Sequence, residues 1–250
     1  MFRFRRIKNR LSAIVINVVT LSRLIIVLYE KQLTWCLTMK QILLYADSLS
    51  WGIVPGSRNR FSFNQRWPGV MELELLQKGN QVRIIEDCLN GRRTVFEDPF
   101  KAGRNGLVGL EQKIEIHSPL SLVMLFLGTN DFQSMHNHNA WHSAQGINSL
   151  ITAIRRAPIE PGMPQPKILV IAPPTIQKPK GDIAAKFEGA EHKAVGLAAA
   201  IQQVANENDC AYFDAGEVIN TSSVDGVHLD LEQHKELGYA LADTVHSLLV

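Results

Sequence analysis

Five short apolar runs punctuate the chain after residue 39, and a helical pattern follows each of them. The runs cover residues 42–45, 82–85, 120–127, 167–172 and 211–213. They are continuous stretches of aliphatic side chains and do not alternate between apolar and polar residues. A continuous run is typical of a strand that is covered on both faces, so the pattern favours a parallel sheet.

The segments between these runs carry apolar residues at helical spacing. We expect helices over residues 67–78, 106–117, 140–156, 183–208 and 231–249. Five strands that alternate with five helices predict an α/β fold, namely a three-layer α/β/α sandwich around a five-stranded parallel sheet. Parallel pairing of successive strands requires right-handed crossovers.

The composition is that of an ordinary globular protein. The chain has 250 residues, of which 46% are hydrophobic and 20% charged, and its formal net charge is +2. These values exclude a disordered polymer, a collagen-like chain and a disulfide scaffold. The near-neutral charge gives no electrostatic argument for a nucleic-acid partner. Three cysteines without a CxxC pair (Cys36, Cys88 and Cys210) support neither a disulfide framework nor a zinc site.

Residues 1–38 form an extension before the predicted domain, which covers residues 39–250. A basic start leads into an apolar run over residues 11–29, which is interrupted by Asn17 and Arg23. Three interpretations stay open: a non-native or dispensable extension with Met39 as the working start, a membrane anchor or uncleaved signal, and a helix packed on the domain. We expect a cytoplasmic protein, with membrane attachment or export only if residues 1–38 act as an anchor or signal.

Two segments far apart in the sequence could supply a nucleophile and its base. Ser48 follows the first strand, where a serine needs a general base to become nucleophilic. Asp225 and His228 precede the last helix, and their spacing lets a carboxylate accept the imidazole Nδ1–H while Nε2 points outward. Each segment also has a simpler interpretation. Ser48 and Asp47 could cap a helix, and Asp225 could form an Asx turn beside a surface histidine.

Two further positions could stabilise an oxyanion. Asn130 follows the third strand, where its side-chain amide can donate a hydrogen bond. Gly91 follows the second strand and could present a backbone N–H with no side chain in the way. In a doubly wound sheet, the loops at the carboxyl ends of the strands converge on one crevice. Together these residues provide what acyl transfer requires.

Ser48, Gly91, Asn130 and the Asp225–His228 pair lie in four sequence blocks. The order of these blocks resembles that of the GDSL, or SGNH, hydrolase family. The match spans roughly residues 40–250, and segments such as 127–131 (LGTND) and 224–228 (VDGVH) read like its bacterial arylesterase and acyltransferase branch. The resemblance implies a flavodoxin-like sheet and no metal or organic cofactor. It also implies the site roles: Ser48 is the nucleophile, His228 the base, Asp225 the acid that orients it, and Ser48 N–H, Gly91 and Asn130 are the oxyanion donors.

The first block departs from the family pattern at one position. The family has Gly-Asp-Ser-Leu, whereas this chain has Ala46 before Asp47. The change is mild if φ of Ala46 is negative, and it strains the turn if φ is positive.

A histidine cluster and the two residues after Asn130 are further candidates for a role near the site. His136, His138 and His142 form a cluster that we interpret as a polar loop near the entrance to the site, in preference to a metal site. We expect Asp131 and Phe132 to shape the acyl pocket.

The segment after the candidate nucleophile is rich in aromatic and basic residues. Trp51 could line the alcohol side of the pocket or simply pack against neighbouring residues. Arg58, Arg60 and Arg66 are expected to form a solvated face or a subunit contact.

These observations favour a serine esterase that hydrolyses short-chain acyl esters through an acyl-enzyme, with transfer to an alcohol as a second outcome. The alternatives are a carbohydrate deacetylase or thioesterase of the same family, and a non-catalytic flavodoxin-like binding module. The expected partner is a small-molecule ester, and a homo-oligomer is compatible with the resemblance.

Overall fold

A five-stranded, all-parallel sheet forms the centre of the domain. The computed structural model describes residues 39–249. The strands are β1 (Lys40–Ala46), β2 (Val82–Cys88), β3 (Leu122–Phe126), β4 (Lys167–Ala172) and β5 (Ala211–Asp214). Their spatial order is β2-β1-β3-β4-β5, and every neighbouring pair is parallel. This is the flavodoxin-like order, so the predicted sheet is confirmed.

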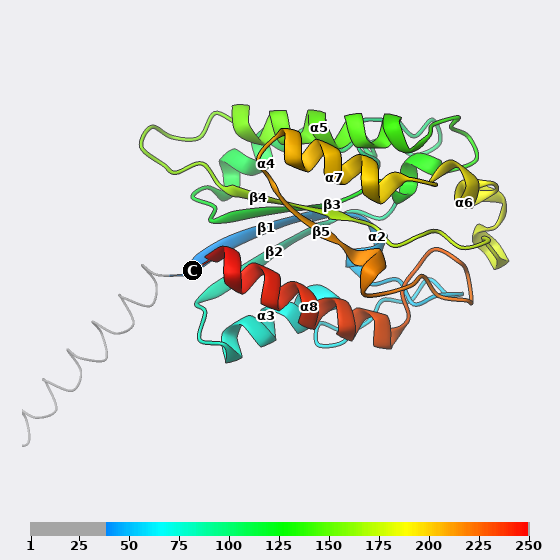
Figure 1. Cartoon of the computed structure of the whole chain (residues 1–250), viewed down its shortest axis with the longest axis horizontal. Helices are drawn as coiled ribbons and strands as arrows, with labels where there is room; N and C mark the ends of the chain where they lie inside the picture. The colour runs from blue at the N-terminus through cyan, green and yellow to red at the C-terminus, as the bar shows by residue number, and fades with distance from the viewer. Residues whose placement is uncertain (1–38, 250) are drawn as a thin grey trace, which may run out of the picture. The chain divides into compact units, whose positions relative to one another are not determined.

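Helices cover both faces of this sheet (Figure 1). One face carries α4 (Leu110–His117), α5 (Ala140–Arg156) and α7 (Leu197–Glu207), and the other carries α3 (Trp67–Gln77) and α8 (Leu231–Leu249). Each face has its own apolar core. Ile147 and Ile201 lie in one, and Trp67 and Leu241 lie in the other, all fully buried. The predicted three-layer α/β/α sandwich is therefore confirmed.

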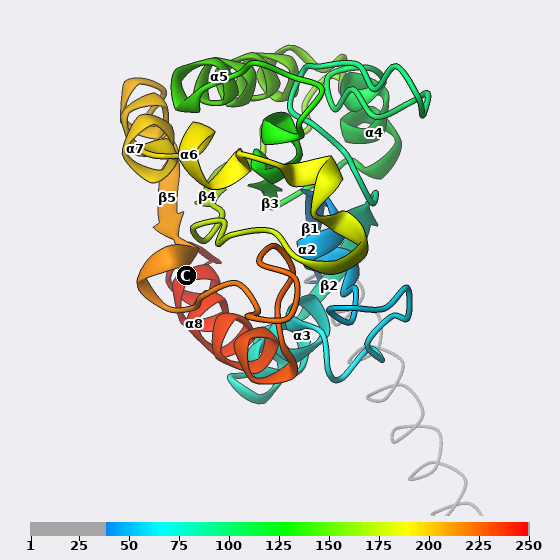
Figure 2. The same cartoon turned by 90° about the vertical axis from the view of Figure 1, so that its right-hand side faces the viewer.

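The expected long helix over residues 183–208 is wrong. The structure has short turns at Gly181–Ile183 and Ala185–Phe187, a single helical turn α6 (Ala190–Lys193), and then α7. Gly189 and Gly196 adopt left-handed φ values of 73° and 84°, and each lies directly before a new helix. A left-handed residue cannot continue a right-handed helix, so the alanine-rich composition of this segment was misleading. The broken segment lies beside the carboxyl ends of the strands, as Figure 2 shows.

Several other boundaries differ by a few residues, and the second strand, for example, ends at Cys88 and not at residue 85. The third strand begins at Leu122 and not at residue 120, and the helix expected from residue 106 begins at Leu110. Gly109, with a φ of 79°, lies just before that helix and sets its start. Within residues 39–249, no helix has the length and apolar character needed to span a membrane. The interpretations of residues 1–38 fall outside the described part of the chain.

Candidate active site

Ser48 lies where β1 gives way to a single helical turn, α2 (Ser48–Trp51). Asp47 caps this turn, because its Oδ1 accepts a hydrogen bond of 2.9 Å from the Leu49 N–H. The sequence allowed two interpretations of this segment, a helix cap or a serine positioned at the end of the first strand, and the structure contains both features. Ser48 therefore lies at the carboxyl edge of the sheet, beside the point where β1 separates β2 from β3.

Ala46 is accommodated at the end of β1. Among residues 39–249, Asp209 is the one non-glycine residue with a positive φ, so Ala46 lies outside the left-handed region. Its side chain is fully buried in the core. The departure from the Gly-Asp-Ser-Leu pattern is thus the mild case, in which the extra methyl group packs without backbone strain.

The loop before α8 places a histidine against Ser48. Nε2 of His228 lies 3.2 Å from Oγ of Ser48, and Nδ1 of His228 lies 2.8 Å from Oδ2 of Asp225. The other oxygen of Asp225 accepts hydrogen bonds from the N–H groups of Val227 and His228, both at 2.9 Å. All three functional side chains are buried. The carboxylate therefore fixes both the loop and the orientation of the imidazole.

Electrostatics keep Asp225 ionised. Burial acts to raise the pKa of its carboxyl, but the hydrogen bonds from His228 and from the loop N–H groups outweigh burial and hold the pKa below its usual value. Gly226, inside this loop, has a φ of 79°, and a Cβ there would approach the Lys178 carbonyl oxygen to 2.6 Å. Only glycine fits this turn, which sets the spacing between Asp225 and His228.

Two residues that can donate hydrogen bonds line the same cavity as Ser48. Gly91 has a φ of 84° and lies on the wall of the cavity described below. Within the described residues, its N–H has no hydrogen-bond partner. Asn130, in the short turn Thr129–Phe132 after β3, donates from Nδ2 to Oδ2 of Asp47 at 2.8 Å. One N–H of that amide remains for a ligand, since an amide nitrogen has two.

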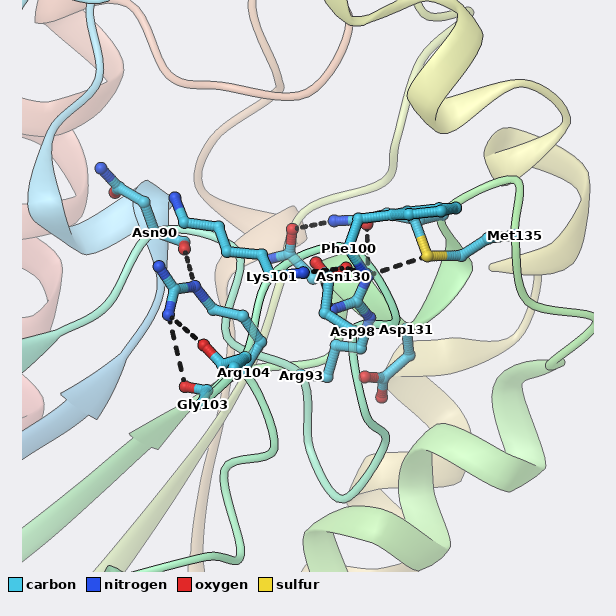
Figure 3. A network of polar contacts seen from close by, with 12 residues as sticks. Asn90, Arg93, Asp98, Phe100, Lys101, Gly103, Arg104, Asn130, Asp131 and Met135 are labelled. Atoms are coloured by element: carbon cyan, nitrogen blue, oxygen red, sulfur yellow. Dashed lines mark hydrogen bonds and ion pairs between the residues drawn. The ribbon is translucent and has the colours of Figure 1, made fainter.

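A chain of buried polar side chains orients the Asn130 amide. Oδ1 of Asn130 accepts a hydrogen bond of 2.7 Å from Nε2 of Gln133, whose Oε1 accepts one of 2.5 Å from Arg93. The guanidinium of Arg93 lies 2.9 Å from a carboxylate oxygen of Asp98 (Figure 3). Gln133 and Arg93 are fully buried. This chain determines which end of the amide is the donor end.

Asp47 lies at the other end of this arrangement. Burial raises the pKa of its carboxyl to about 6, although the Leu49 N–H, the charge on His228 and the Asn130 amide act in the opposite direction. Asp47 thus links the helical turn that carries Ser48 to the amide of Asn130.

A cavity of about 370 Å³ opens over these groups. Its wall contains all five residues that the sequence predicts to be catalytic or oxyanion-binding: Ser48, Gly91, Asn130, Asp225 and His228. Apolar wall residues that the sequence did not single out are Ile53, Phe187 and Val224, of which Phe187 comes from the segment wrongly expected to be a continuous helix. The predicted convergence of distant segments on one crevice is therefore present in the structure.

Asp131 and Phe132 do not line this cavity, contrary to expectation. The Asp131 carboxylate accepts hydrogen bonds from Thr94 N–H at 2.9 Å, Thr94 Oγ1 at 2.8 Å and Ser143 Oγ at 2.6 Å. It ties the loop after β2 to α5. Phe132 is fully buried in the core between the sheet and α5. Both residues follow Asn130 in a tight turn that directs them inward, away from the pocket.

The residues after Ser48 have diverging roles. Trp51 is not part of the cavity wall, and the guanidinium of Arg60 lies 4.7 Å from the centre of its ring. Arg60 and Arg66 both approach Glu86, with Arg66 making a bidentate pair at 2.8 and 2.7 Å. Arg58 alone of the three arginines lines the cavity. The expectation of a solvated face thus misses the contacts of Arg60 and Arg66 with Glu86.

The histidine cluster stacks on an aromatic ring. The rings of Phe96 and His138 are 3.8 Å apart, and those of His138 and His136 are 5.0 Å apart. His142 completes the N-terminal cap of α5 with Asn139. Burial, together with the charges on the neighbouring histidines, lowers the pKa of His138 to about 4. Within residues 39–249, no three side chains suited to a metal ion are gathered in one place.

A serine, histidine and aspartate at the carboxyl edge of a doubly wound sheet define a hydrolase of the serine type. A family model, the GDSL-like lipase/acylhydrolase family, matches residues 47–245. The chain belongs to this family and is a carboxylic ester hydrolase.

Solved structures agree with this assignment. An inhibitor-bound aryl esterase from M. smegmatis is 35% identical, with a TM-score of 0.79, and the match covers 84% of this chain and 100% of that one. Est24, a carbohydrate acetylesterase from Sinorhizobium meliloti, is 33% identical, with a TM-score of 0.78 and coverage of 84% and 99%. A putative arylesterase from Agrobacterium tumefaciens is 35% identical, with a TM-score of 0.77 and coverage of 84% and 100%. A comparison with curated proteins found no match.

Proposed function

We propose that the protein hydrolyses short-chain acyl esters of aryl or alkyl alcohols through an acyl-enzyme on Ser48. The observation that carries this proposal is the continuous hydrogen-bonded chain from Asp225 through His228 to Ser48, at a cavity wall that also presents Asn130 and Gly91. The aryl esterases among the similar structures support the aryl alcohol.

In the first half of the reaction, Oγ of Ser48 forms a bond to the ester carbonyl carbon while Nε2 of His228 takes the hydroxyl proton. The negative charge that develops on the carbonyl oxygen is stabilised by the N–H groups of Ser48 and Gly91 and by Nδ2 of Asn130. Each such donor is worth about 2.7–4 kcal/mol in the transition state. The bond to the alcohol oxygen then breaks, and His228 returns the proton to that oxygen.

In the second half, water takes the place of the alcohol. His228 removes a proton from the water as its oxygen attacks the acyl carbon, and the proton passes to Oγ of Ser48 when the acid leaves. An alcohol that enters instead of water gives an ester as product, so acyl transfer uses the same groups. The cavity of about 370 Å³ lies near the small end of the range for ligand sites, which favours short acyl chains.

A second candidate substrate is an acetylated carbohydrate. It is favoured by the likeness to the Sinorhizobium meliloti carbohydrate acetylesterase and by the polar wall of the cavity, which includes Asn90, Ser57 and Asp182. The two substrates are distinguished by comparing kcat/KM for p-nitrophenyl acetate with that for acetylated sugars.

The test of the proposal is a pair of serine variants. Ser48→Ala should abolish hydrolysis of p-nitrophenyl acetate with little change in Tm. Ser50→Ala is the matched control, because Ser50 is two residues away on the same turn and its buried hydroxyl has no hydrogen-bond partner within residues 39–249. It should keep its activity. Wild-type rates in Ser48→Ala would refute the assignment of the nucleophile.

A further inference from the structure

Basic side chains surround the cavity that holds Ser48. Arg58 comes from the segment after α2, Lys101 from the loop between β2 and α4, and Lys180 and Lys186 from the segment after β4. Three separate parts of the chain therefore bring positive charge to one opening. All four residues are exposed enough to meet a ligand from solvent.

This concentration of charge is not a property of the whole domain. Residues 1–38 contain seven of the 26 basic residues of the chain and one of its 24 acidic residues. Residues 39–250 therefore carry a formal net charge of −4. A basic opening on an acidic body produces a local field that attracts anions toward the site.

Within residues 39–249, the carboxylates on the cavity wall form no ion pair with these four cations. Asp98 is engaged by Arg93 at 2.9 Å and by the N–H groups of Phe100 and Lys101, and Asp225 is engaged by His228. Asp182 is the remaining wall carboxylate, and within residues 39–249 it makes no ion pair with any of the basic residues.

The cations themselves lack anionic partners in the described part of the chain. The side chains of Arg58, Lys101 and Lys186 make no hydrogen bond or ion pair there, and the ammonium of Lys180 donates to the Ser223 carbonyl at 3.0 Å. Figure 3 shows the Lys101 side chain ending without a contact among the residues drawn. Arg104, adjacent to Gly91, donates hydrogen bonds to the carbonyls of Asn90, Ala102 and Gly103, and within residues 39–249 it forms no ion pair.

These charges also act on one another. Burial lowers the pKa of the Lys186 ammonium, and the positive charges of Arg93, Lys101 and Arg58 lower it further, while the carboxylate of Asp98 acts in the opposite direction. Like charges that lie close together repel one another, and a bound anion relieves that repulsion.

We propose that the preferred substrate is an ester that carries a second, anionic group, such as a carboxylate or phosphate, on the part of the molecule that extends toward the opening. This inference rests on the proposed esterase function and names its substrate class. Ser48 and His228 act on the ester carbonyl, while Lys101 and Lys186, together with Arg58, hold the distant anion and raise the rate of capture from solution.

The experiment compares anionic esters with neutral ones in variants of the opening. The alcohol-side pair is 4-acetoxybenzoate and its methyl ester, and the acyl-side pair is 4-nitrophenyl hemisuccinate and 4-nitrophenyl butyrate. For each pair, the ratio of kcat/KM for the anionic ester to that for the neutral ester is measured in wild type and in the double variant Lys101→Gln/Lys186→Gln. Taking the ratio removes differences in intrinsic reactivity. Lys235→Gln, an exposed lysine of α8 outside the cavity wall, loses the same kind of charge and is the control.

We expect the ratio for at least one pair to fall by about five- to tenfold in the double variant, as removing two charges at a separation of several ångströms predicts, and to stay at the wild-type value in Lys235→Gln. Raising the ionic strength from about 0.01 to about 0.5 M should lower kcat/KM for the anionic ester more than for the neutral one. The pair that responds identifies the side of the ester on which the anion lies.

Unchanged ratios in the double variant, with active hydrolysis of the neutral esters, would overturn the anionic substrate and leave the esterase function standing. A fall of equal size in Lys235→Gln would also overturn it, because the effect would then come from overall charge. Absence of hydrolysis of all four esters would contradict the esterase function itself and this inference with it.

Discussion

Nε2 of His228 lies 3.2 Å from Oγ of Ser48, although 180 residues separate the two in the sequence. Neither side chain could reach the other without the sheet order, which places the end of β1 beside the loop that precedes α8. The fold therefore does what local sequence cannot, because it holds these two groups within hydrogen-bond distance.

We predict that the carboxylate of Asp225 determines which nitrogen of His228 acts as the base. In Asp225→Asn, the amide oxygen can still accept from the loop N–H groups, but the amide NH₂ faces Nδ1 of the ring. The imidazole must then hold its proton on Nε2, where it cannot accept one from Ser48. We expect kcat for p-nitrophenyl acetate to fall by about 10³–10⁴-fold, with the Tm nearly unchanged.

Asp230→Asn is the control for this change, because Asp230 lies in the same loop and, within residues 39–249, its carboxylate accepts a hydrogen bond only from Ser222 Oγ, at 2.9 Å. It should keep most of the activity. A small loss in Asp225→Asn, comparable with that in the control, would show that the orienting role lies elsewhere.

Gln133 is predicted to act on the reaction through Asn130. Replacing Gln133 with Glu removes the N–H that holds Oδ1 of Asn130 and places an acceptor opposite it, while the contact with Arg93 is kept. The amide of Asn130 should then turn or loosen. We expect kcat to fall by about tenfold with little change in KM, because the donor acts mainly in the transition state.

The Asn130→Ala background tests whether that effect runs through the amide. In Asn130→Ala, the additional change Gln133→Glu should lower kcat little further, since the group that Gln133 positions is already gone. Equal losses in both backgrounds would indicate a structural role for Gln133 alone.

Gly91 is predicted to be needed for its backbone conformation. An alanine there meets nothing closer than 3.8 Å, so it adds no clash, but a φ of 84° costs an L-residue about 1–2 kcal/mol. Relief of that strain would turn the N–H away from the cavity and lower kcat/KM for the ester.

Gly103→Ala is the matched control. Gly103 belongs to the same loop, has a φ of 73° and has no neighbour within 4 Å of an added Cβ, but it lies outside the cavity wall. Urea unfolding should show similar losses of stability in both variants, and only Gly91→Ala should lose activity. Equal activity in Gly91→Ala and Gly103→Ala would argue against an oxyanion role for Gly91.

The buried carboxyl of Asp131 predicts an unusual dependence of stability on pH. Burial raises its pKa to about 6, against the opposing hydrogen bonds from Ser143 and Thr94, so the folded state binds a proton that the unfolded state releases near pH 3.8. Because the pKa is higher in the folded state, protonation of Asp131 stabilises the fold. This contribution to the free energy of unfolding is complete below pH 3.8 and is lost as the pH rises through about 6. In Asp131→Asn the contribution is absent.

The free energy of unfolding of Asp131→Asn, relative to wild type, should therefore rise between pH 4 and pH 7.5, by on the order of 3 kcal/mol. Urea unfolding of both proteins at these two pH values measures the change. If the difference in the free energy of unfolding between variant and wild type were the same at both pH values, Asp131 would be ionised throughout the range.

The sequence predicts much of the fold and the position of the candidate site. Strands buried on both faces leave continuous apolar runs, and three of the candidate site residues follow the ends of those runs within a few positions. Ser48, Gly91 and Asn130 could therefore be placed at one edge before any coordinates were known. The helix expected over residues 183–208 failed because helix-forming alanines hid two glycines in left-handed conformations.

The supports of the site could not be predicted. Arg93 and Gln133 are 40 residues apart and meet only through the tertiary fold, and no spacing rule links such a pair. Asp131 was expected at the pocket because it follows Asn130 directly, but the tight turn after β3 directs the two side chains to opposite sides. Basic residues at the cavity opening come from three segments, so their proximity also emerges only in three dimensions.

Covalent trapping tests the central claim most directly. Wild-type protein and the Ser48→Ala variant would be treated with an aryl or alkyl fluorophosphonate, which phosphonylates activated serines, and the modified peptide would be located by mass spectrometry. We expect one adduct per chain on the peptide that contains Ser48, and none in Ser48→Ala. An adduct on another residue, or equal labelling of the variant, would contradict it.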